Sequence, residues 1–372
     1  MQNQHNNPVL IFAQSGRFLA QSAAQAGLPV WVADYFGDQD TLSIAKRWHQ
    51  LPVLSELNDD SILNVFSELT NGEKCSLICG NGIEYCYALL EQLPDNIQLV
   101  GNTAHTINTI KTPTLFFSLL DQLNIAYPET QFEHPGDNKI WLTKSASGLG
   151  GGHIHYLDQQ ANLTGYYFQR FIRGASGSGL FLANGKQAQL ISINKQNCTA
   201  SKQSPFLLSS VETPWSISDR HIHQLEQIII KLTPATGLVG LNSLDFIISE
   251  QNELLVLEIN PRPSSSAELI DLNSPLFQHH VDACRGILPN EPIIRSASKT
   301  SLRYLYANAD WIIPADIIWP SECHDLPAMN TLIKKQEPIC TSIVQASSGQ
   351  DVNYLHQDIE NRVANQLQKL EK

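Results

Sequence analysis

The chain has 372 residues, a formal net charge of −12 and 42% hydrophobic residues. This length exceeds what one hydrophobic core usually fills, so we expect two or three packed units. The acidic balance excludes a general nucleic-acid binder, which needs clustered Lys and Arg. The start MQNQHNN is polar, and no apolar run reaches the ~20 residues that cross a bilayer, so we expect a cytoplasmic protein without a membrane partner.

The first hundred residues alternate short apolar runs with segments of helical apolar spacing. Strands are predicted at 8–13, 28–34, 76–80 and 97–101, and helices at 18–27 and 81–94. This order is typical of a doubly wound parallel sheet. The first turn lacks the glycines of a dinucleotide fingerprint, so we expect the strand ends to contact a substrate instead. The segments concerned are 14–17, 34–38 and 80–84, together with 174–179.

The rest of the chain mixes strands with three predicted helices, at 112–124, 222–237 and about 352–370. The pair Asn184-Gly185 predicts a hairpin turn within 180–196. The seven cysteines have no familiar zinc spacing and are expected to be buried thiols.

Two apolar, strand-like runs near residue 250 each carry one acid. A polar turn at 250–253 pairs Ser249 with Leu254, and counting outward sets Asp245 opposite Glu258. Directly opposed residues lie ~4.5–5.5 Å apart, and like charges there are destabilising. A bound cation would remove that penalty.

Strand alternation supports the same interpretation. It predicts Leu255, Leu257 and Ile259 on one face and Glu258 and Asn260 on the other. Two carboxylates and an amide oxygen suit a hard divalent ion that also binds water and phosphate, as Mg²⁺ does with ATP. The predicted metal ligands are Asp245, Glu258 and Asn260.

A glycine-rich loop supplies a candidate phosphate site. Lys144 precedes Gly148, Gly150, Gly151 and Gly152 in KSASGLGGG. Glycines let backbone N–H groups approach phosphate oxygens, and the lysine adds a positive charge. The Walker A pattern is absent, so the loop supports nucleotide binding only together with the acidic hairpin.

The segments KSASGLGGG, QRFI, LDF and LEINPRP, in this order and spacing, resemble the ATP-grasp superfamily and its carboxylate–amine ligases. The resemblance implies an α/β and α+β fold. It divides the chain into a Rossmann-like pre-ATP-grasp domain (1–105), an ATP-grasp domain of two lobes that close on ATP (106–289) and a small C-terminal β-rich lobe (290–372).

The resemblance also implies roles for individual residues. Arg262 and Lys144 match catalytic positions, and the acidic trio matches ligands of Mg²⁺ or Mn²⁺. The positions that match ATP-binding residues are Lys111, Lys144, Ser147, Gly148, Gly150, Gly151, Gln169, Arg170, Phe171 and Ile172. Two positions depart from the family, with Gln169 where a glutamate is frequent and Ser176 near the expected ribose-binding acid.

The implied reaction is ATP-dependent amide formation through an acyl phosphate, with a small carboxylate and an amine as partners and a homodimer as the assembly to test. More narrowly, FAQSGRFLAQ and NPRPSSSAEL resemble predicted carboligases related to tyramine–glutamate ligase. That implies glutamate as a substrate and a role in one-carbon cofactor biosynthesis. Two alternatives stay open: a carboxylase-like enzyme that uses bicarbonate, and an ATP-binding protein that does not catalyse.

Overall fold

The computed structural model describes residues 7–53, 56, 58–145, 148–157, 165–199, 204–272, 274–293, 298–347 and 351–369. Within these ranges, no helix combines the length and the apolar character that spanning a membrane requires.

The N-terminal part is built on a parallel five-stranded sheet with the order β3-β2-β1-β4-β5. Its strands are β1 (Val9–Ala13), β2 (Val30–Asp34), β3 (Arg47–Gln50), β4 (Cys75–Cys79) and β5 (Ile97–Leu99). Its helices are α1 (Arg17–Gln25), α2 (Gln39–Leu42) and α3 (Asp59–Thr70). β1 and β2 are buried along their whole length, as expected for a sheet covered on both faces. The predicted doubly wound opening is confirmed.

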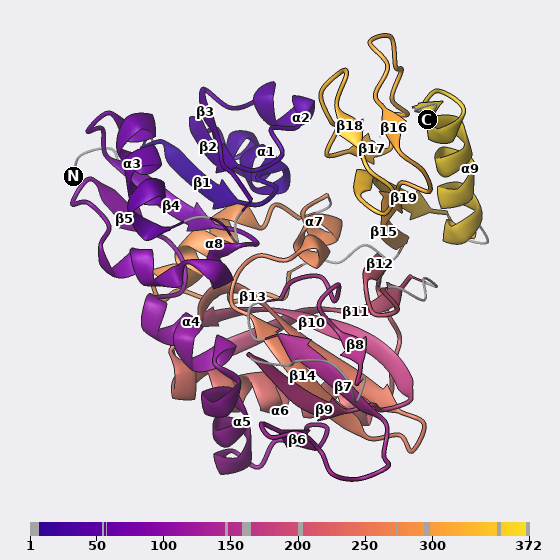
Figure 1. Ribbon diagram of the computed structural model, residues 1–372. Helices are drawn as coiled ribbons and strands as arrows, with labels where there is room; N and C mark the ends of the chain where they lie inside the picture. Colours follow the sequence, from indigo (N-terminus) through magenta and orange to yellow (C-terminus); the bar gives the residue numbers. More distant parts are fainter. Residues whose placement is uncertain are drawn as a thin grey trace.

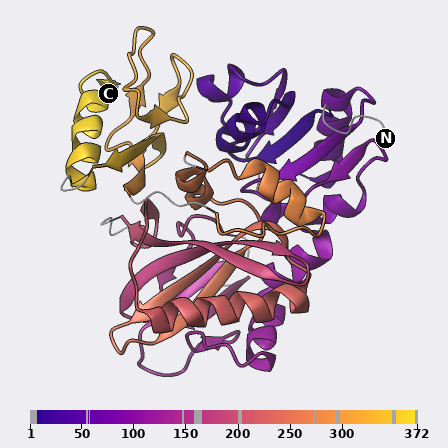
Figure 2. The same ribbon diagram turned by 180° about the vertical axis from the view of Figure 1, so that it is seen from behind.

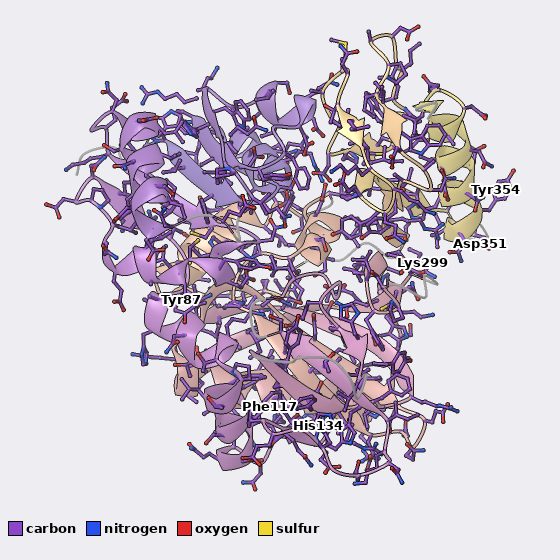
Figure 3. All side chains as sticks on the ribbon, in the orientation of Figure 1. Tyr87, Phe117, His134, Lys299, Asp351 and Tyr354 are labelled. Carbon is purple, nitrogen blue, oxygen red and sulfur yellow. The ribbon has the colours of Figure 1, made fainter. Side chains whose placement is uncertain are left out.

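The helix predicted at 81–94 is wrong. Two short 3₁₀ helices, Ile83–Tyr85 and Tyr87–Glu91, replace it. Gly82 adopts φ +106°, and its N–H donates to the carboxylate of Glu84 at 2.9 Å, so the chain turns tightly instead of starting an α-helix. Tyr87 then donates to Asn108 of the next helix, α4 (Ala104–Lys111), at 2.8 Å (Figure 3).

The largest sheet has eight strands in the order β14-β13-β10-β11-β12-β15-β19-β17. These are β14 (Leu254–Asn260), β13 (Val239–Ser249), β10 (Gly174–Asn184), β11 (Ala188–Cys198), β12 (Leu208–Thr213), β15 (Lys299–Tyr306), β19 (Pro338–Ala346) and β17 (Cys323–His324). The predicted turn at Asn184 is confirmed, since it joins β10 to β11. Helix α6 (Asp219–Thr236) crosses one face of this sheet (Figure 2).

A smaller antiparallel sheet lies on the other side, in front of β14 and β10 in Figure 1. Its order is β6-β9-β7-β8, with β6 (Thr130–Gln131), β9 (Tyr166–Arg170), β7 (Trp141–Ser145) and β8 (His155–Tyr156). Helix α5 (Pro113–Gln122) leads into it, and its Phe117 contacts Tyr167 of β9 with ring centroids 5.8 Å apart. The predicted site residues are divided between the two sheets: Lys144 lies on β7 of the smaller sheet, and Asp245 and Glu258 lie on β13 and β14 of the larger one.

The C-terminal part continues the large sheet. β15 pairs with β12, and Lys299 of β15 forms an ion pair with Glu212 of β12 at 2.6 Å (Figure 3). The remaining elements are α7 (Ser265–Asp271), α8 (Phe277–Cys284), β16 (Trp311–Ile312), β18 (Leu332–Ile333), α9 (Val352–Ala364) and β20 (Gln368–Lys369). The division of the chain at residues 105 and 289 stays a prediction.

Candidate nucleotide and metal site

Asp245 of β13 is paired with Glu258 of β14, as predicted. The hairpin reaches this register by an unexpected route. Ile248 pairs with Leu254, one position away from the predicted closure, and a β-bulge next to Asp245 restores the count. Bulges are common beside active sites because they re-aim side chains.

The predicted faces of β14 need a correction for the same reason. Leu254, Val256 and Ile259 are the buried core residues, whereas Leu255 and Leu257 are half-buried. The bulge interrupts strict alternation, so Leu257 and Glu258 both lie outside the core. The acid therefore escapes the apolar interior without a break in the strand.

The three predicted metal ligands lie together. Asn260 Nδ2 donates to Asp245 Oδ2 at 3.2 Å and to Glu258 Oε1 at 3.4 Å. Gln196 of β11 and Ser243 of β13 each donate to Asp245 Oδ1 at 3.3 Å. The N–H and O–H groups of neutral side chains thus stabilise two opposed carboxylates.

Lys111 joins this cluster from the end of α4. Its ammonium contacts Glu258 Oε2 and Asn260 Oδ1, both at 3.2 Å, and its side chain is only 10% exposed. Lys111 therefore contacts two residues that follow it by 147 and 149 positions in the sequence.

The charges of the cluster affect each other strongly. Desolvation alone would raise the pKa of Glu258, but the positive charges of Lys111 and Lys144 hold that pKa below its usual range. Desolvation and the negative charge of Glu258 raise the pKa of Asp245. The ligand-free pair is therefore stable with one ionised carboxylate, and ionisation of the second requires a further cation nearby.

The donor set fits a hard divalent ion with few protein ligands. Within the part of the chain that the structure describes, no three or more His, Cys, Asp or Glu side chains cluster as metal ligands. This site has two carboxylates, and its third oxygen belongs to an amide. Asn260 now turns its NH₂ group toward both acids, so ligation requires its carboxamide to rotate and present the oxygen. Such a site leaves room for water and phosphate oxygens.

Lys144 points inward from β7. It is 7% exposed and donates to Gln169 Oε1 at 2.7 Å, and Gln169 Nε2 donates to Thr130 at 3.1 Å. Burial lowers the pKa of Lys144 to about 8, although the charges of Glu258 and Asp245 partly oppose this. The lysine is therefore within electrostatic reach of the acidic hairpin on the other sheet.

The glycine loop is shaped by its contacts with protein. A Cβ on Gly148 would lie 1.8 Å from the ring of His153, and one on Gly151 would lie 2.0 Å from the carbonyl oxygen of Phe206. Gly150 has φ +63° and open space around it. Ser147 lies outside the described residues. Packing thus explains two of the glycines, and Gly150 stays the best candidate for close approach to a ligand.

The segment from Gln169 to Ile172 joins the two sheets. Arg170 turns away from the acidic hairpin, because its guanidinium lies over Trp141 at 5.6 Å and donates to Ile140 O at 3.0 Å. The backbone N–H groups of Arg170 and Phe171 are already bonded to Glu129 O and Ile140 O. Among the described residues, the Ile172 N–H has no partner, so it is the donor of this segment that a ligand can use.

Arg262 is separate from the acidic trio. Its Nε donates to Glu84 Oε1 at 2.7 Å and its Nη1 to Pro263 O at 3.2 Å, while Nη2 meets no acceptor within the described ranges. The charges of Arg262 and Lys111 hold the pKa of Glu84 below its usual range, although burial opposes this. Glu84 thus fixes Arg262 and leaves one nitrogen for a substrate.

Glu84 was not predicted, and neither were Gln196 and Ser243. The segment 80–84 was expected to contact substrate, but nothing in the local pattern pairs Glu84 with an arginine 178 residues away. Gln196 could have been found from the hairpin at Asn184, because it lies on the strand that follows.

Comparison with known proteins indicates a family and a fold. Residues 110–266 match a family described as an ATP-grasp domain. An uncharacterised protein of Methanocaldococcus jannaschii is 22% identical over 95% of this chain and 92% of its own length. Among solved structures, the biotin carboxylase domain of Hydrogenobacter thermophilus 2-oxoglutarate carboxylase, in complex with MgADP, ADP and bicarbonate, has a TM-score of 0.75 at 11% identity and covers 98% of this chain and 90% of that one. An L-amino acid ligase from Bacillus licheniformis has a TM-score of 0.70 at 13% identity and covers 99% of both chains. At these identities the likeness shows a shared fold.

Proposed function

We propose, from the premise that residues 110–266 belong to the ATP-grasp family, that this protein is an ATP- and Mg²⁺-dependent ligase that joins a small carboxylate to an amine. The observation that carries the proposal is the meeting of Asp245, Glu258 and Asn260 with Lys111, opposite the buried Lys144. Opposed carboxylates ringed by lysines are costly in an ordinary sheet, and they suit a metal-bound polyphosphate.

The roles of the residues follow from their surroundings. Asp245, Glu258 and Asn260 would hold Mg²⁺ or Mn²⁺, which supplies positive charge to the phosphates when bound. Lys111 and Lys144 bind phosphate oxygens from opposite sides. Gly150 and the Ile172 N–H contact the nucleotide through the backbone, with Gln169 holding Lys144 in place.

The reaction has two displacements. A carboxylate oxygen of the substrate bonds to the γ-phosphorus of ATP while the bond to the β-phosphate oxygen breaks, giving an acyl phosphate and ADP. The amine then attacks the acyl carbon, loses a proton and expels phosphate. Arg262 binds the carboxylate through its unpartnered Nη2, and losing one such contact typically costs ~10²–10³ in rate.

A panel of acids and amines tests this function. Purified protein, Mg-ATP and pairs of substrates are expected to release phosphate only when both an acid and an amine are present. Glutamate is the first acid to test, because of the resemblance to tyramine–glutamate ligase, and a positive result would also support a role in cofactor biosynthesis. Tight ATP binding without turnover by any pair would favour the non-catalytic alternative.

A second candidate is a reaction that uses bicarbonate as the acid. It is favoured by the likeness to a carboxylase domain whose structure contains bicarbonate. Phosphate release that depends on bicarbonate and persists without other acids would favour this reading over amide formation.

A further inference from the structure

A second charged cluster lies where α1, α7 and the loop around Asp325 meet, between the N-terminal sheet and the C-terminal part (Figure 1). Its centre is Arg17, the first residue of α1, which is 2% exposed. Arg17 Nη2 donates to Glu268 Oε2 at 2.8 Å, Nη1 donates to the same carboxylate, and Nε donates to Asp325 Oδ1 at 2.8 Å. Asp40 Oδ2 lies 3.8 Å from Arg17 Nε. One guanidinium thus forms ion pairs with three carboxylates.

A fourth carboxylate in the cluster has no partner. Asp38 is 4% exposed, and within the described ranges its Oδ2 has no hydrogen-bond donor. It is the N-cap residue of α2, but its side chain makes no capping hydrogen bond. Asp38 is followed directly by Gln39 and Asp40, whose hydrogen bonds to the loop at 325–326 place this segment beside the cluster.

The neighbouring Asp34 shows what a structural acid looks like here. It accepts hydrogen bonds from Gly16 N at 3.0 Å, Gly37 N at 3.1 Å and Trp48 Nε1 at 2.9 Å. These bonds hold the turns after β1 and β2. Asp38 lacks comparable donors, although it is almost as deeply buried.

The charges of the cluster do not balance. Asp38, Asp40, Glu268 and Asp325 surround one guanidinium, and a buried carboxylate without a partner is costly. His324 does not supply the missing charge, because burial lowers its pKa. Desolvation and the neighbouring acids raise the pKa of Asp38 to about 8.

The cluster is open to solvent on one side. The side chain of Asp325 is 21% exposed and that of Asp40 is 15% exposed. Among the described residues, no three or more His, Cys, Asp or Glu side chains are grouped as metal ligands, and this includes the acids of the cluster. Asp40 already accepts from the backbone N–H groups of Asp325 and Leu326, and Asp325 accepts from Ser15 Oγ. Each carboxylate oxygen can accept a second hydrogen bond, which suits the N–H donors of an ammonium or guanidinium group.

The cluster is close in sequence to Arg262, the proposed substrate-binding arginine. Glu268 lies on α7, which begins at Ser265, three positions after Arg262. Tyr304 of β15 bonds to Ser265 and is within electrostatic reach of Asp325, Glu268 and Arg262. The segment from Arg262 to Glu268, together with Tyr304, thus connects the cluster to the proposed substrate arginine.

We propose that this cluster recognises a positively charged nitrogen of the amine substrate, which binds Asp38 together with Asp40 and Asp325. The acceptor is then a diamine or a guanidino-amine: one nitrogen is held here and the other attacks the acyl group. This inference rests on the proposed ligase function, and it names the class of acceptor that the function leaves open.

Calorimetric titration of the full chain without ATP tests it. Butane-1,4-diamine and agmatine are expected to bind at least tenfold more tightly than butylamine, which has the same chain and one charge fewer. Asp38→Asn is expected to weaken the diamine at least tenfold. The matched control Asp60→Asn, which removes the same charge from the exposed first turn of α3, is expected to change nothing.

The outcomes separate this inference from the ligase proposal. Equal binding of butylamine, no binding of either probe, or unchanged binding by Asp38→Asn would overturn it. Asp38→Asn replaces a buried carboxyl group whose Oδ2 has no hydrogen-bond donor among the described residues, so it should fold with an unchanged or higher Tm, and Asp38→Ser serves as a second variant. Diamine binding without ATP turnover would sink only the ligase function. Turnover of neutral amines that Asp38→Asn leaves intact would sink only the inference.

Discussion

Asp245 and Glu258 are directly opposed across β13 and β14, but only Glu258 forms an ion pair with Lys111, at 3.2 Å. The two acids are therefore not equivalent. Asp245 accepts hydrogen bonds from the neutral side chains Gln196, Ser243 and Asn260.

This asymmetry predicts opposite effects on stability. Asp245→Asn makes permanent the uncharged state that the raised pKa of Asp245 favours, and it is expected to stabilise the ligand-free protein by ~0.2–1 kcal/mol. Glu258→Gln breaks a partly exposed ion pair and is expected to destabilise it by up to about 1 kcal/mol. Urea unfolding without Mg²⁺ or nucleotide measures both changes, and equal shifts of the same sign would contradict the prediction.

Each of the two variants is nevertheless expected to lose phosphate release. Each removes a proposed metal ligand, so phosphate release should fall by about 10²-fold or more. Glu253→Gln is a matched control, because it removes an exposed acid from the turn of the same hairpin. A loss shared by this control would point to hairpin folding rather than to metal binding.

The pair of Glu84 and Arg262 predicts a large structural cost. Glu84 has a side-chain exposure of 2%, and Arg262 donates to it at 2.7 Å. Arg262→Ala leaves the buried carboxylate of Glu84 without its ion-pair partner and is expected to destabilise the protein by ~3–5 kcal/mol. Arg262→Lys should recover part of this stability but not activity, because a lysine cannot bind Glu84 and a substrate carboxylate as a planar fork does. Thermal unfolding and phosphate release measured on both variants check this.

The lowered pKa of Lys144, about 8, predicts a pH limit on ATP use. Lys144 binds phosphate when protonated, so kcat/KM for ATP should be level below that pKa and fall about tenfold per pH unit above it. Lys144→Arg keeps its charge over this range and should lack the decline, whatever its absolute rate. A decline of equal position and slope in the variant would assign it to another group.

Asp38 predicts a pH dependence of stability. Its pKa is raised to about 8 in the folded chain from 3.8, mainly by burial, so between these values the folded state binds more protons than the unfolded state. The free energy of unfolding therefore decreases as pH rises from about 4 to 8, by at most ~1.4 kcal/mol per unit, and levels off above that. Asp38→Asn should remove this contribution, which urea unfolding at several pH values measures. A difference between variant and wild type that stays constant with pH would contradict the prediction.

The parts of the site that follow from local pattern were predictable from sequence. The opposed acids and Asn260 lie on one hairpin, where a polar turn and apolar runs fix the pairing almost completely. The bulge was not predictable, because Leu257 looks like any other apolar strand residue. It changed the buried face of β14 while leaving Asp245 opposite Glu258.

Contacts between segments that lie far apart in the sequence were not predicted. Glu84 lies in a stretch whose apolar spacing resembles a helix, and only the folded chain brings it to Arg262. Arg17 bonds to Glu268 and Asp325, which follow it in the sequence by 251 and 308 positions. The segments 14–17 and 34–38 were expected to contact substrate, but no pattern within them indicated a charge imbalance.

Calorimetric titration of ADP with and without Mg²⁺ tests the central claim most directly. Mg²⁺ is expected to tighten ADP binding by at least tenfold in the wild type, and the double variant Asp245→Asn/Glu258→Gln is expected to lose this gain while still binding metal-free ADP. If Mg²⁺ leaves the affinity of the wild type unchanged, or tightens binding equally in the double variant, the acidic hairpin is not the metal site of a nucleotide-dependent ligase.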